Sequence, residues 1–484
     1  MEKVRRSCQD KQRVSSGIEG LDAVLHGGFV PRRAYLVSGG PGSGKTTLGL
    51  HFLAAARGEP ALLVSLGEAA DDIRADAESI GLDLSTITLL DLTPGRADSD
   101  HASYKLLEPW EAEAPDLRER IDSVCPHGVP RRVFIDALSQ FRHLVPDAFQ
   151  FRKQVMALLQ YLTAAGATVV FTAEQGSAAD DDLQYLGDGI LKLEQSPDGR
   201  ALHVVKCRGA GFAEGRHAVR LGSCGMRVYP RLIPEDHRQS FTPEAIPFGL
   251  AELDALTGGG LQRGTVTLIS GPSGVGKTSL GTHVMGEAAR RGERSAIFTF
   301  EERVGTLSHR CEQIGIPLSQ MMDAGTLAVR EVEPLRYMPE EFACSVQREV
   351  EERGVRMVML DSLSGYRQSV RGQDITPHIH ALCRYLSNMG VTVLLINEIS
   401  AIAGGEVRVS EYGISYLADA VLMLRYIELD GELRKTIGTL KKRTGDFEKT
   451  LRHFDITRNG LSVGDPIKGM RGIISGMPEL QDNA

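Results

Sequence analysis

The feature that most constrains the fold of this chain is a long-range internal repeat. GIEGLD, beginning at Gly17, reappears as GLAELD at Gly249, and GGPGSGKT at Gly39 reappears as GPSGVGKT at Gly271. Both pairs keep one offset, because 249 − 17 = 232 and 271 − 39 = 232. A fixed period of this length indicates two copies of one folding unit.

A proline-rich segment lies between the two copies. Residues 229–247 contain four prolines and few apolar residues, which interrupts both helical and strand patterns. A chain of 484 residues is also too long to fold around one hydrophobic core. We therefore predict an N-terminal domain over residues 1–240 and a C-terminal domain, with a short tail, over residues 241–484.

Short apolar runs alternate with longer amphipathic stretches in each copy. Nearly continuous runs of leucine and β-branched residues are typical of parallel strands that helices cover on both faces. We expect such strands at residues 34–38, 61–66, 132–135 and 168–172, and at 266–270, 296–300, 357–360 and 392–396. The predicted fold class is α/β, with two mostly parallel sheets flanked by helices.

Each copy contains G-x-x-x-x-G-K-[ST] directly after an expected strand and before a helical pattern. The glycines let the loop wrap a triphosphate, so that backbone N–H groups and the helix N-terminus point at phosphate oxygens. The lysine reaches the β- and γ-phosphates, and the next hydroxyl ligates Mg²⁺. A chance glycine-rich turn is the alternative, which two copies in one context disfavour. The residues expected to bind nucleotide are Gly39, Gly40, Pro41, Gly42, Ser43, Gly44, Lys45, Thr46 and Thr47, and Gly271, Pro272, Ser273, Gly274, Val275, Gly276, Lys277, Thr278 and Ser279.

Farther along each copy an apolar strand ends in aspartate, at Asp136 and at Asp361. Carboxylates at the C-terminal edge of a parallel sheet lie beside the phosphate site, where they can hold magnesium together with Thr46 and Thr278. Many strands end in aspartate before a turn, so this pattern alone is not specific. It indicates a metal ligand here because a P-loop precedes it in both copies. Together these features predict two tandem RecA-like P-loop nucleoside-triphosphatase domains that bind ATP and Mg²⁺.

A third site position follows the strand after each P-loop helix. Copy two has Glu301 and Glu302 there, whereas copy one has Gly67 and Glu68. A carboxylate at this place can orient and deprotonate the water, or the protein hydroxyl, that attacks the γ-phosphate. Solvated surface charge is the alternative explanation. Because glycine replaces the first glutamate in copy one, the two sites are not chemically equivalent.

Near the end of each copy a strand carries a basic pair, Lys206 with Arg208 and Lys441 with Arg443. Alternate residues of a strand point to the same face, so each pair projects together. Such a pair can neutralise transition-state charge on the γ-phosphate of a neighbouring subunit, as an arginine finger does. An exposed pair on an edge strand is the alternative that residue chemistry alone favours.

The overall charge argues against a nucleic-acid partner. The formal net charge is −8, and no strong Lys/Arg run lies outside the basic pairs, whereas DNA motors need basic loops around a channel. A RecA- or DnaB-like DNA-dependent ATPase is therefore the weaker alternative, and a nucleotide-gated scaffold with negligible turnover is another. No run approaches the roughly 18–20 apolar residues of a membrane span. The seven cysteines show no CxxC spacing, so we expect a cytoplasmic protein.

The chain resembles the KaiC family of tandem RecA-like ATPases, which includes the core clock ATPase of cyanobacteria. The resemblance covers nearly the whole chain and is carried by GIEGLD, both P-loops, FEE at 300–302, IDALSQF and LDSLSGY, KCRG and KKRTG, and IISGMP at 473–478. It implies an ATP-dependent homohexameric double ring with nucleotide between subunits and both basic pairs acting in trans. It also implies a signalling or timing role with a KaiB-like or other signalling partner.

Clock members of this family phosphorylate an adjacent Ser-Thr pair in their second domain. The matching positions here are Ser415 and Tyr416, and Ser410 lies five residues upstream. The resemblance therefore implies a serine autokinase with Ser415, or Ser410, as the phosphoacceptor. Tyrosine in place of threonine departs from the two-site pattern of the clock proteins.

Overall fold

The computed structural model describes residues 13–93, 114–144, 147–174, 181–370, 376–399, 414–429, 431–473 and 479–480. The chain forms two compact units, Met1–Arg231 and Leu232–Ala484. The division lies within the proline-rich segment and precedes residue 240. The reason is that the Asn388 amide donates to the Pro234 carbonyl at 2.7 Å, and the Gln239 N–H donates to the Asn388 carbonyl at 3.0 Å. These contacts attach this part of the segment to the C-terminal unit.

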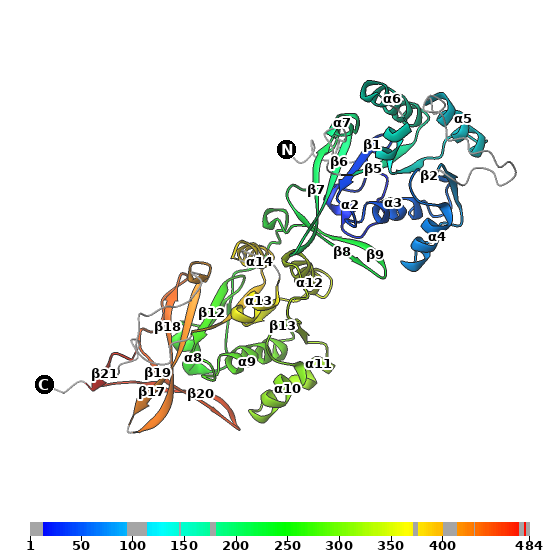
Figure 1. Ribbon diagram of the computed structural model, residues 1–484. Helices are drawn as coiled ribbons and strands as arrows, with labels where there is room; N and C mark the ends of the chain where they lie inside the picture. Colours follow the sequence, from blue (N-terminus) through cyan, green and yellow to red (C-terminus); the bar gives the residue numbers. More distant parts are fainter. Residues whose placement is uncertain are drawn as a thin grey trace. The chain divides into compact units, whose positions relative to one another are not determined.

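In the described part of the N-terminal unit, a nine-stranded sheet has the order β3-β2-β4-β5-β1-β6-β7-β8-β9 (Figure 1). Strand β1 is parallel to both neighbours, β5 and β6, whereas β6 to β9 pair antiparallel. The strands are β1 (Ala34–Gly39), β2 (Ala61–Ser65), β3 (Ile87–Asp91), β4 (Arg132–Asp136), β5 (Thr168–Glu174), β6 (Gly189–Ser196), β7 (Gly199–Cys207), β8 (His217–Gly222) and β9 (Gly225–Tyr229). The helices are α2 (Leu21–Val24), α3 (Lys45–Ala54), α4 (Ala70–Ser79), α5 (Ala114–Val124), the 3-10 helix η1 (Leu138–Leu144), α6 (Ala148–Ala164) and α7 (Asp181–Leu186).

The C-terminal unit repeats this plan in its described residues, with the sheet order β14-β13-β15-β16-β12-β17-β18-β19-β20. Its main strands are β12 (Val266–Gly271), β13 (Ser295–Thr299), β14 (Leu327–Glu331), β15 (Met357–Asp361), β16 (Thr392–Glu398), β17 (Ala420–Leu429), β18 (Glu432–Lys442), β19 (Arg452–Thr457) and β20 (Gly460–Pro466). Two short sheets pair β10 (Ala245–Ile246) with β11 (Leu261–Gln262), and β21 (Met470–Arg471) with β22 (Glu479–Leu480). The helices are η2 (Pro234–Asp236), α8 (Ala251–Leu256), α9 (Lys277–Arg290), α10 (Val304–Gln313), α11 (Leu318–Asp323), α12 (Pro339–Glu351), α13 (Leu363–Ser369), α14 (Thr376–Asn388) and η3 (Ile414–Tyr416).

Helices cover both faces of each main sheet, because successive strand residues point to opposite sides. In β1, Tyr35 and Val37 pack in one apolar cluster with α3, and Leu36 packs in a second with α6. In β12, Ile269 packs with α9, and Leu268 packs with α12 and α14. The central strands are therefore buried on both sides, which accounts for their nearly continuous apolar sequences.

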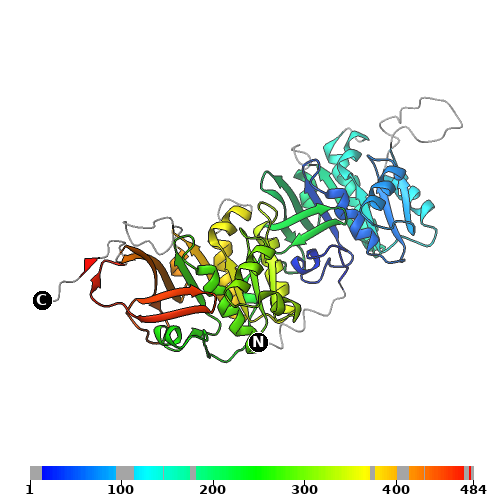
Figure 2. The ribbon, with the colours of Figure 1, turned by 90° about the horizontal axis from the view of Figure 1, so that it is seen from below.

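The predicted α/β class with two mostly parallel sheets is confirmed, and each predicted strand is present with ends shifted by at most two residues. Of the antiparallel strands that complete each sheet, β7 and β18 contain the predicted strand positions Lys206 and Lys441, and the others are additional to those predicted. One pair of them, β19 and β20, forms the hairpin coloured orange to red in Figure 2. Among the described residues, no helix combines the length and the apolar character needed to cross a bilayer.

Candidate active sites

Both P-loops run from a central strand into a helix whose first residue is the motif lysine. Gly44 and Gly276 cap these helices with φ values of 101° and 111°, a left-handed conformation that favours glycine. The Lys45 ammonium donates to two loop carbonyls at 2.9 and 3.0 Å, and the Lys277 ammonium donates to one at 2.8 Å. Each lysine therefore lies over its own loop, at the helix end where phosphate oxygens bind.

The other predicted loop residues divide by exposure. Ser43 and Val275 occupy equivalent positions and are 1% and 0% exposed, so only their backbone can face a phosphate. Thr46, Thr47 and Thr278 are half-buried. Pro41, Gly42, Ser273 and Gly274 are exposed, and Gly40 is half-buried. The buried loop residues are Gly39, Gly271, Pro272 and Ser279. The loops thus present backbone N–H groups, a lysine and threonine hydroxyls, which fit a phosphate and Mg²⁺.

The C-terminal site brings the motif threonine and the strand-end aspartate together. The Thr278 hydroxyl lies near Asp361, the last residue of β15. Burial raises the pKa of the Asp361 carboxyl to about 6, against the opposing effects of Thr278 and of Arg310. A divalent cation stabilises the charged form that burial disfavours, so this carboxylate fits a Mg²⁺ ligand.

The aspartate of the N-terminal site has a different partner. Asp136, at the end of β4, is half-buried and accepts a hydrogen bond from Thr172 of β5. Within the part of the chain that the structure describes, no hydrogen bond joins Asp136 to Thr46.

Glu301 and Glu302 are each held by a side chain from another element. Ser362, the N-cap residue of α13, donates its hydroxyl to Oε1 of Glu301 at 2.7 Å. Arg310 of α10 pairs with Oε2 of Glu302 at 2.6 Å. The two adjacent carboxylates thus have distinct, fixed positions at the end of β13.

Lys277 shares its electrostatic environment with three carboxylates. Burial lowers the pKa of Lys277, and the negative charges of Glu398, Asp361 and Glu301 oppose that decrease. Glu398 ends β16 and pairs in register with Gly271 at the start of the P-loop. The predicted lysine, aspartate and first glutamate therefore belong to one site, and Glu398 joins them.

The glutamate of the N-terminal site, Glu68, has acidic neighbours. Gly67 precedes Glu68, so this strand end carries a single glutamate. Burial raises the pKa of Glu68, and the carboxylates of Asp136, Asp76 and Asp72 raise it further. Asp76 lies in α4 at the position that an arginine has in α10. The two sites therefore differ in the charge that surrounds their common glutamate.

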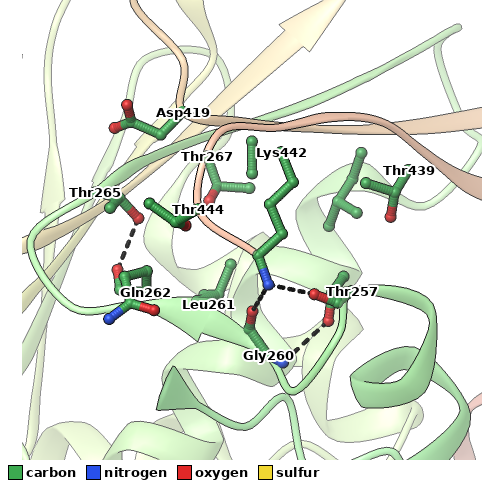
Figure 3. Close-up of a pocket in the computed structure, with 12 residues that line it drawn as sticks. Thr257, Gly260, Leu261, Gln262, Thr265, Thr267, Asp419, Thr439, Lys442 and Thr444 are labelled. Carbon is green, nitrogen blue, oxygen red and sulfur yellow. Dashed lines mark hydrogen bonds between the residues drawn. The ribbon is translucent and has the colours of Figure 1, made fainter. Parts of the chain in front are cut away.

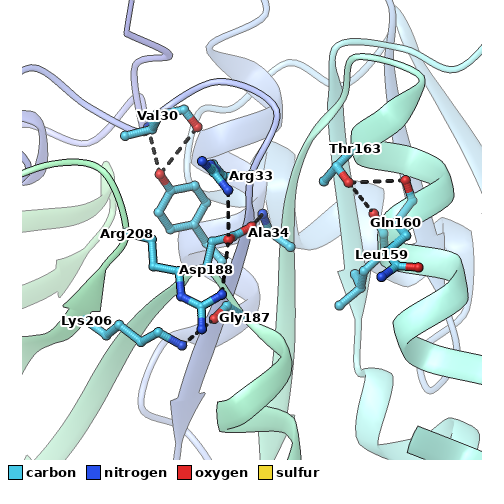
Figure 4. A network of polar contacts seen from close by, with 11 residues as sticks. Val30, Arg33, Ala34, Leu159, Gln160, Thr163, Gly187, Asp188, Lys206 and Arg208 are labelled. Atoms are coloured by element: carbon cyan, nitrogen blue, oxygen red, sulfur yellow. Dashed lines mark hydrogen bonds and ion pairs between the residues drawn. The ribbon is translucent and has the colours of Figure 1, made fainter. Parts of the chain in front are cut away.

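The side chains of the basic pair of the N-terminal unit lie beside Gly187 and Asp188 (Figure 4). The Lys206 ammonium donates to the Gly187 carbonyl at 2.8 Å. Asp188 lies 4.0 Å from Arg208 and 3.1 Å from Arg33. Lys206 and Arg208 thus lie together beside Asp188, but β7 ends at Cys207, so only Lys206 belongs to the strand, and Arg208 is exposed.

The basic pair of the C-terminal unit contacts the segment that contains Ser415. The Lys441 ammonium donates to the carbonyls of Ser415 and Ala418 at 3.1 and 2.7 Å. The Arg443 guanidinium donates to the carbonyl of Tyr416 at 2.9 Å. The same two cations that are expected to act on phosphate therefore also position the backbone of η3.

Lys442, between these two cations, points the opposite way. Its ammonium donates to the carbonyls of Thr257 and Gly260, and it lines a small pocket rich in threonine (Figure 3). This contact ties β18 to the turn after α8. Lys442 therefore has a structural role, separate from that of the basic pair.

Comparison with known proteins decides the family. A family model described as the KaiC ATPase matches residues 14–233 and 246–468, which is most of both units. The chain belongs to the KaiC family of ATPases. It is accordingly a KaiC-like ATP-binding protein with two tandem domains.

Its relatives include cyanobacterial KaiC proteins. "Circadian clock oscillator protein KaiC" of Acaryochloris marina is 26% identical over 484 residues, which cover 96% of this chain and 91% of the relative. The protein of the same description from Picosynechococcus is 27% identical over 96% of this chain and 92% of its own length. "Circadian clock oscillator protein KaiC 1" of Synechocystis is 26% identical, with the same coverage of 96% and 92%.

Three polar residues of the KaiC-like C-terminal site were not predicted. Glu398 ends an apolar strand, TVLLINE, and Ser362 follows the strand-end aspartate at a helix start, so both carry the kind of pattern that identified Asp361. Arg310 lies within a helix and meets Glu302 only through packing. A sequence pattern finds strand ends readily, but it does not reveal which helix face lies over them.

Proposed function

We propose that this KaiC-family chain hydrolyses ATP at two sites of unequal rate and phosphorylates itself on serine at the second. The observation that carries the proposal is the grouping of Thr278 with Asp361 at the site that also holds Lys277 and Glu301. Mg²⁺, when bound, neutralises charge on the β- and γ-phosphates. Thr278 and Asp361 would hold the ion, and Lys277 would bind phosphate oxygens.

Glu301 is the proposed base of the C-terminal site, because Ser362 fixes its carboxylate. In hydrolysis a water oxygen bonds to the γ-phosphorus, and the bond from that phosphorus to the β–γ bridging oxygen breaks. Glu301 accepts a water proton, and ADP leaves. Glu302, paired with Arg310, supports the same strand end. A base of this kind contributes on the order of 10²- to 10⁴-fold to the rate.

Single P-loop variants of the full chain test the unequal rates. Lys277→Ala is expected to remove most ATPase activity, and Lys45→Ala to remove little. Nucleotide binding at the intact site provides the control for folding in each variant. The reverse pattern would show that Glu68 alone suffices and that the base is wrongly assigned.

Ser415 is the proposed phosphoacceptor. It lies in η3, where Lys441 holds its carbonyl and Arg443 holds the next one. In the transfer the Ser415 hydroxyl oxygen bonds to the γ-phosphorus, ADP leaves, and the hydroxyl proton passes to a glutamate of the site. Tyr416 carries its hydroxyl several ångströms farther from the backbone, and in-line transfer is sensitive to misplacement of roughly 1 Å. Ser410, the second candidate, lies outside the described residues.

Mass spectrometry of phosphopeptides after incubation with Mg·ATP tests this assignment. Phosphate on Ser415 is expected, and a Glu301→Gln/Glu302→Gln variant is the matched control that lacks the base. Phosphate on Ser410 alone, on Tyr416 or nowhere contradicts the assignment. The last result would leave an ATPase without kinase activity.

The family supports an ATP-dependent homohexamer in which Lys206, Arg208, Lys441 and Arg443 act on a neighbour's nucleotide. It also supports binding to a signalling protein of the KaiB type. Light scattering at micromolar concentration, with and without Mg·ATP, tests the ring. A monomer in both conditions contradicts it.

A further inference from the structure

The two sites differ by a reciprocal exchange of side chains. In the C-terminal site, glutamate faces glycine: a Cβ atom at Gly365 would lie 3.0 Å from Cγ and Oε1 of Glu301. In the N-terminal site Gly67 stands at the position of Glu301, and Gln140 stands at the position of Gly365. The glycine and the long polar residue have therefore exchanged places. A Cβ atom at Gly67 would lie 2.7 Å from Oε1 and 2.8 Å from Cδ of Gln140. Each site therefore places one polar side chain in the corresponding space, but from opposite elements.

A third position changes with the other two. Ser362, which donates to Glu301, is replaced by Ala137 in the N-terminal site. The hydroxyl that fixes a carboxylate is thus absent from the site that has no carboxylate at that point. The C-terminal unit thus has Glu301, Ser362 and Gly365 at these three positions. The N-terminal unit has Gly67, Ala137 and Gln140.

Gln140 is held at the predicted catalytic edge of the sheet. Its backbone N–H donates to the Ala137 carbonyl at 3.0 Å, within the first turn of η1. The Leu66 N–H donates to the Asp136 carbonyl at 2.8 Å, which keeps the ends of β2 and β4 together. The carboxamide of Gln140 lies against Gly67, the residue directly before Glu68.

We propose that the Gln140 carboxamide orients the attacking water in the N-terminal site, in place of the missing glutamate. This inference rests on the proposed ATPase activity of that site. A carboxamide oxygen accepts a hydrogen bond from water, and its NH₂ group donates to a phosphate oxygen. A neutral carboxamide does not take up a proton at neutral pH, so it positions the water without acting as a base.

The proton goes to Glu68 in this scheme. The water oxygen bonds to the γ-phosphorus, the bond to the β–γ bridging oxygen breaks, ADP leaves, and Glu68 accepts one water proton. Its raised pKa, caused by burial and nearby carboxylates, makes Glu68 a stronger base when ionised. In the N-terminal site Gln140 positions the water and Glu68 accepts its proton, whereas Glu301 does both in the C-terminal site.

The test uses the full chain with Lys277→Ala, so that the remaining turnover belongs to the N-terminal site. Adding Lys45→Ala must abolish that turnover, which tests the proposed function separately. Gln140→Ala is expected to lower kcat by roughly 10- to 100-fold, in line with the loss of one oriented hydrogen-bonding group. The Kd of a fluorescent ATP analogue is expected to change by less than about 3-fold. Gln160→Ala, at an exposed glutamine of α6, is the matched control.

An exchange of residues tests the geometry itself. Gly67→Ala is expected to lower the thermal midpoint and kcat because its Cβ meets the Gln140 carboxamide. Gly67→Glu is expected to show the same loss, which Gln140→Gly in the same chain relieves. Unchanged kcat in Gln140→Ala overturns the proposal, as does a loss of analogue binding in proportion to kcat. An inert N-terminal site in the Lys277→Ala chain also overturns it.

Discussion

Replacing Asp361 with asparagine is expected to stabilise the C-terminal unit when Mg²⁺ is removed. Asp361 is 9% exposed, and burial raises its pKa from the ordinary 3.8 to about 6. Asparagine keeps an oxygen that can accept a hydrogen bond from Thr278 but carries no charge. The substitution therefore removes a desolvated charge and preserves the contact.

The size and sign of the effect follow from this pKa. The folded state holds the Asp361 proton more tightly than the unfolded state, so the stability from this group is present below about pH 3.8 and is lost as the pH rises to about 6. A difference of roughly two units corresponds to about 3 kcal/mol in the free energy of unfolding. For a unit of this size, that is roughly 6–12 °C in the thermal midpoint.

Scanning calorimetry of the full chain in EDTA, at several values between pH 4 and pH 8, measures the effect. The midpoint difference between Asp361→Asn and the parent chain is expected to be largest above pH 7 and small at pH 4. Asp455→Asn, at an exposed position of β19, is the matched control. Mg·ATP is expected to stabilise the parent and not Asp361→Asn. A variant that is less stable than the parent at pH 8, or a difference independent of pH, refutes the reasoning.

Three further outcomes are expected. Lys442→Ala is expected to lower the thermal midpoint, because Lys442, unlike Lys441, ties β18 to the turn after α8. Lys441→Ala is expected to lower ATPase activity with little loss of stability. Calorimetry and turnover measurements on both variants distinguish the two effects. Arg263→Ala costs roughly 1.5–3 kcal/mol in urea unfolding, since its side chain is 1% exposed and pairs with two glutamates that remain partly solvated without it. Ser362→Ala lowers the kcat of the C-terminal site about 10-fold with nearly unchanged nucleotide affinity, because Glu301 loses the hydroxyl that orients it.

The sequence was sufficient for the features that depend on local pattern. Apolar runs located the parallel strands, because burial on both faces leaves few polar residues in them. The glycine-lysine motif located both loops, since positions such as Gly276, with φ of 111°, favour glycine. Asp361 was recognised because strand ends meet at one edge of a parallel sheet.

Features that depend on how one element packs against another were not predicted. Arg310 reaches Glu302 through the way α10 lies over the sheet, and nothing in its neighbouring residues indicates that contact. Gln140 meets Gly67 across 73 residues, as 140 − 67 = 73, and only the fold brings them together. The pKa of Asp361 depends on burial, which a strand-end pattern does not quantify.

The tandem arrangement has a consequence for stoichiometry. Two sites with different carboxylates lie in one polypeptide, on sheets whose strands follow the same order. Translation therefore produces them in a ratio of one to one at every expression level, which two separate genes would have to regulate. Any assembly of this chain contains as many sites with Glu301 as sites with Gln140, so the balance between them is set by rate constants and not by subunit composition.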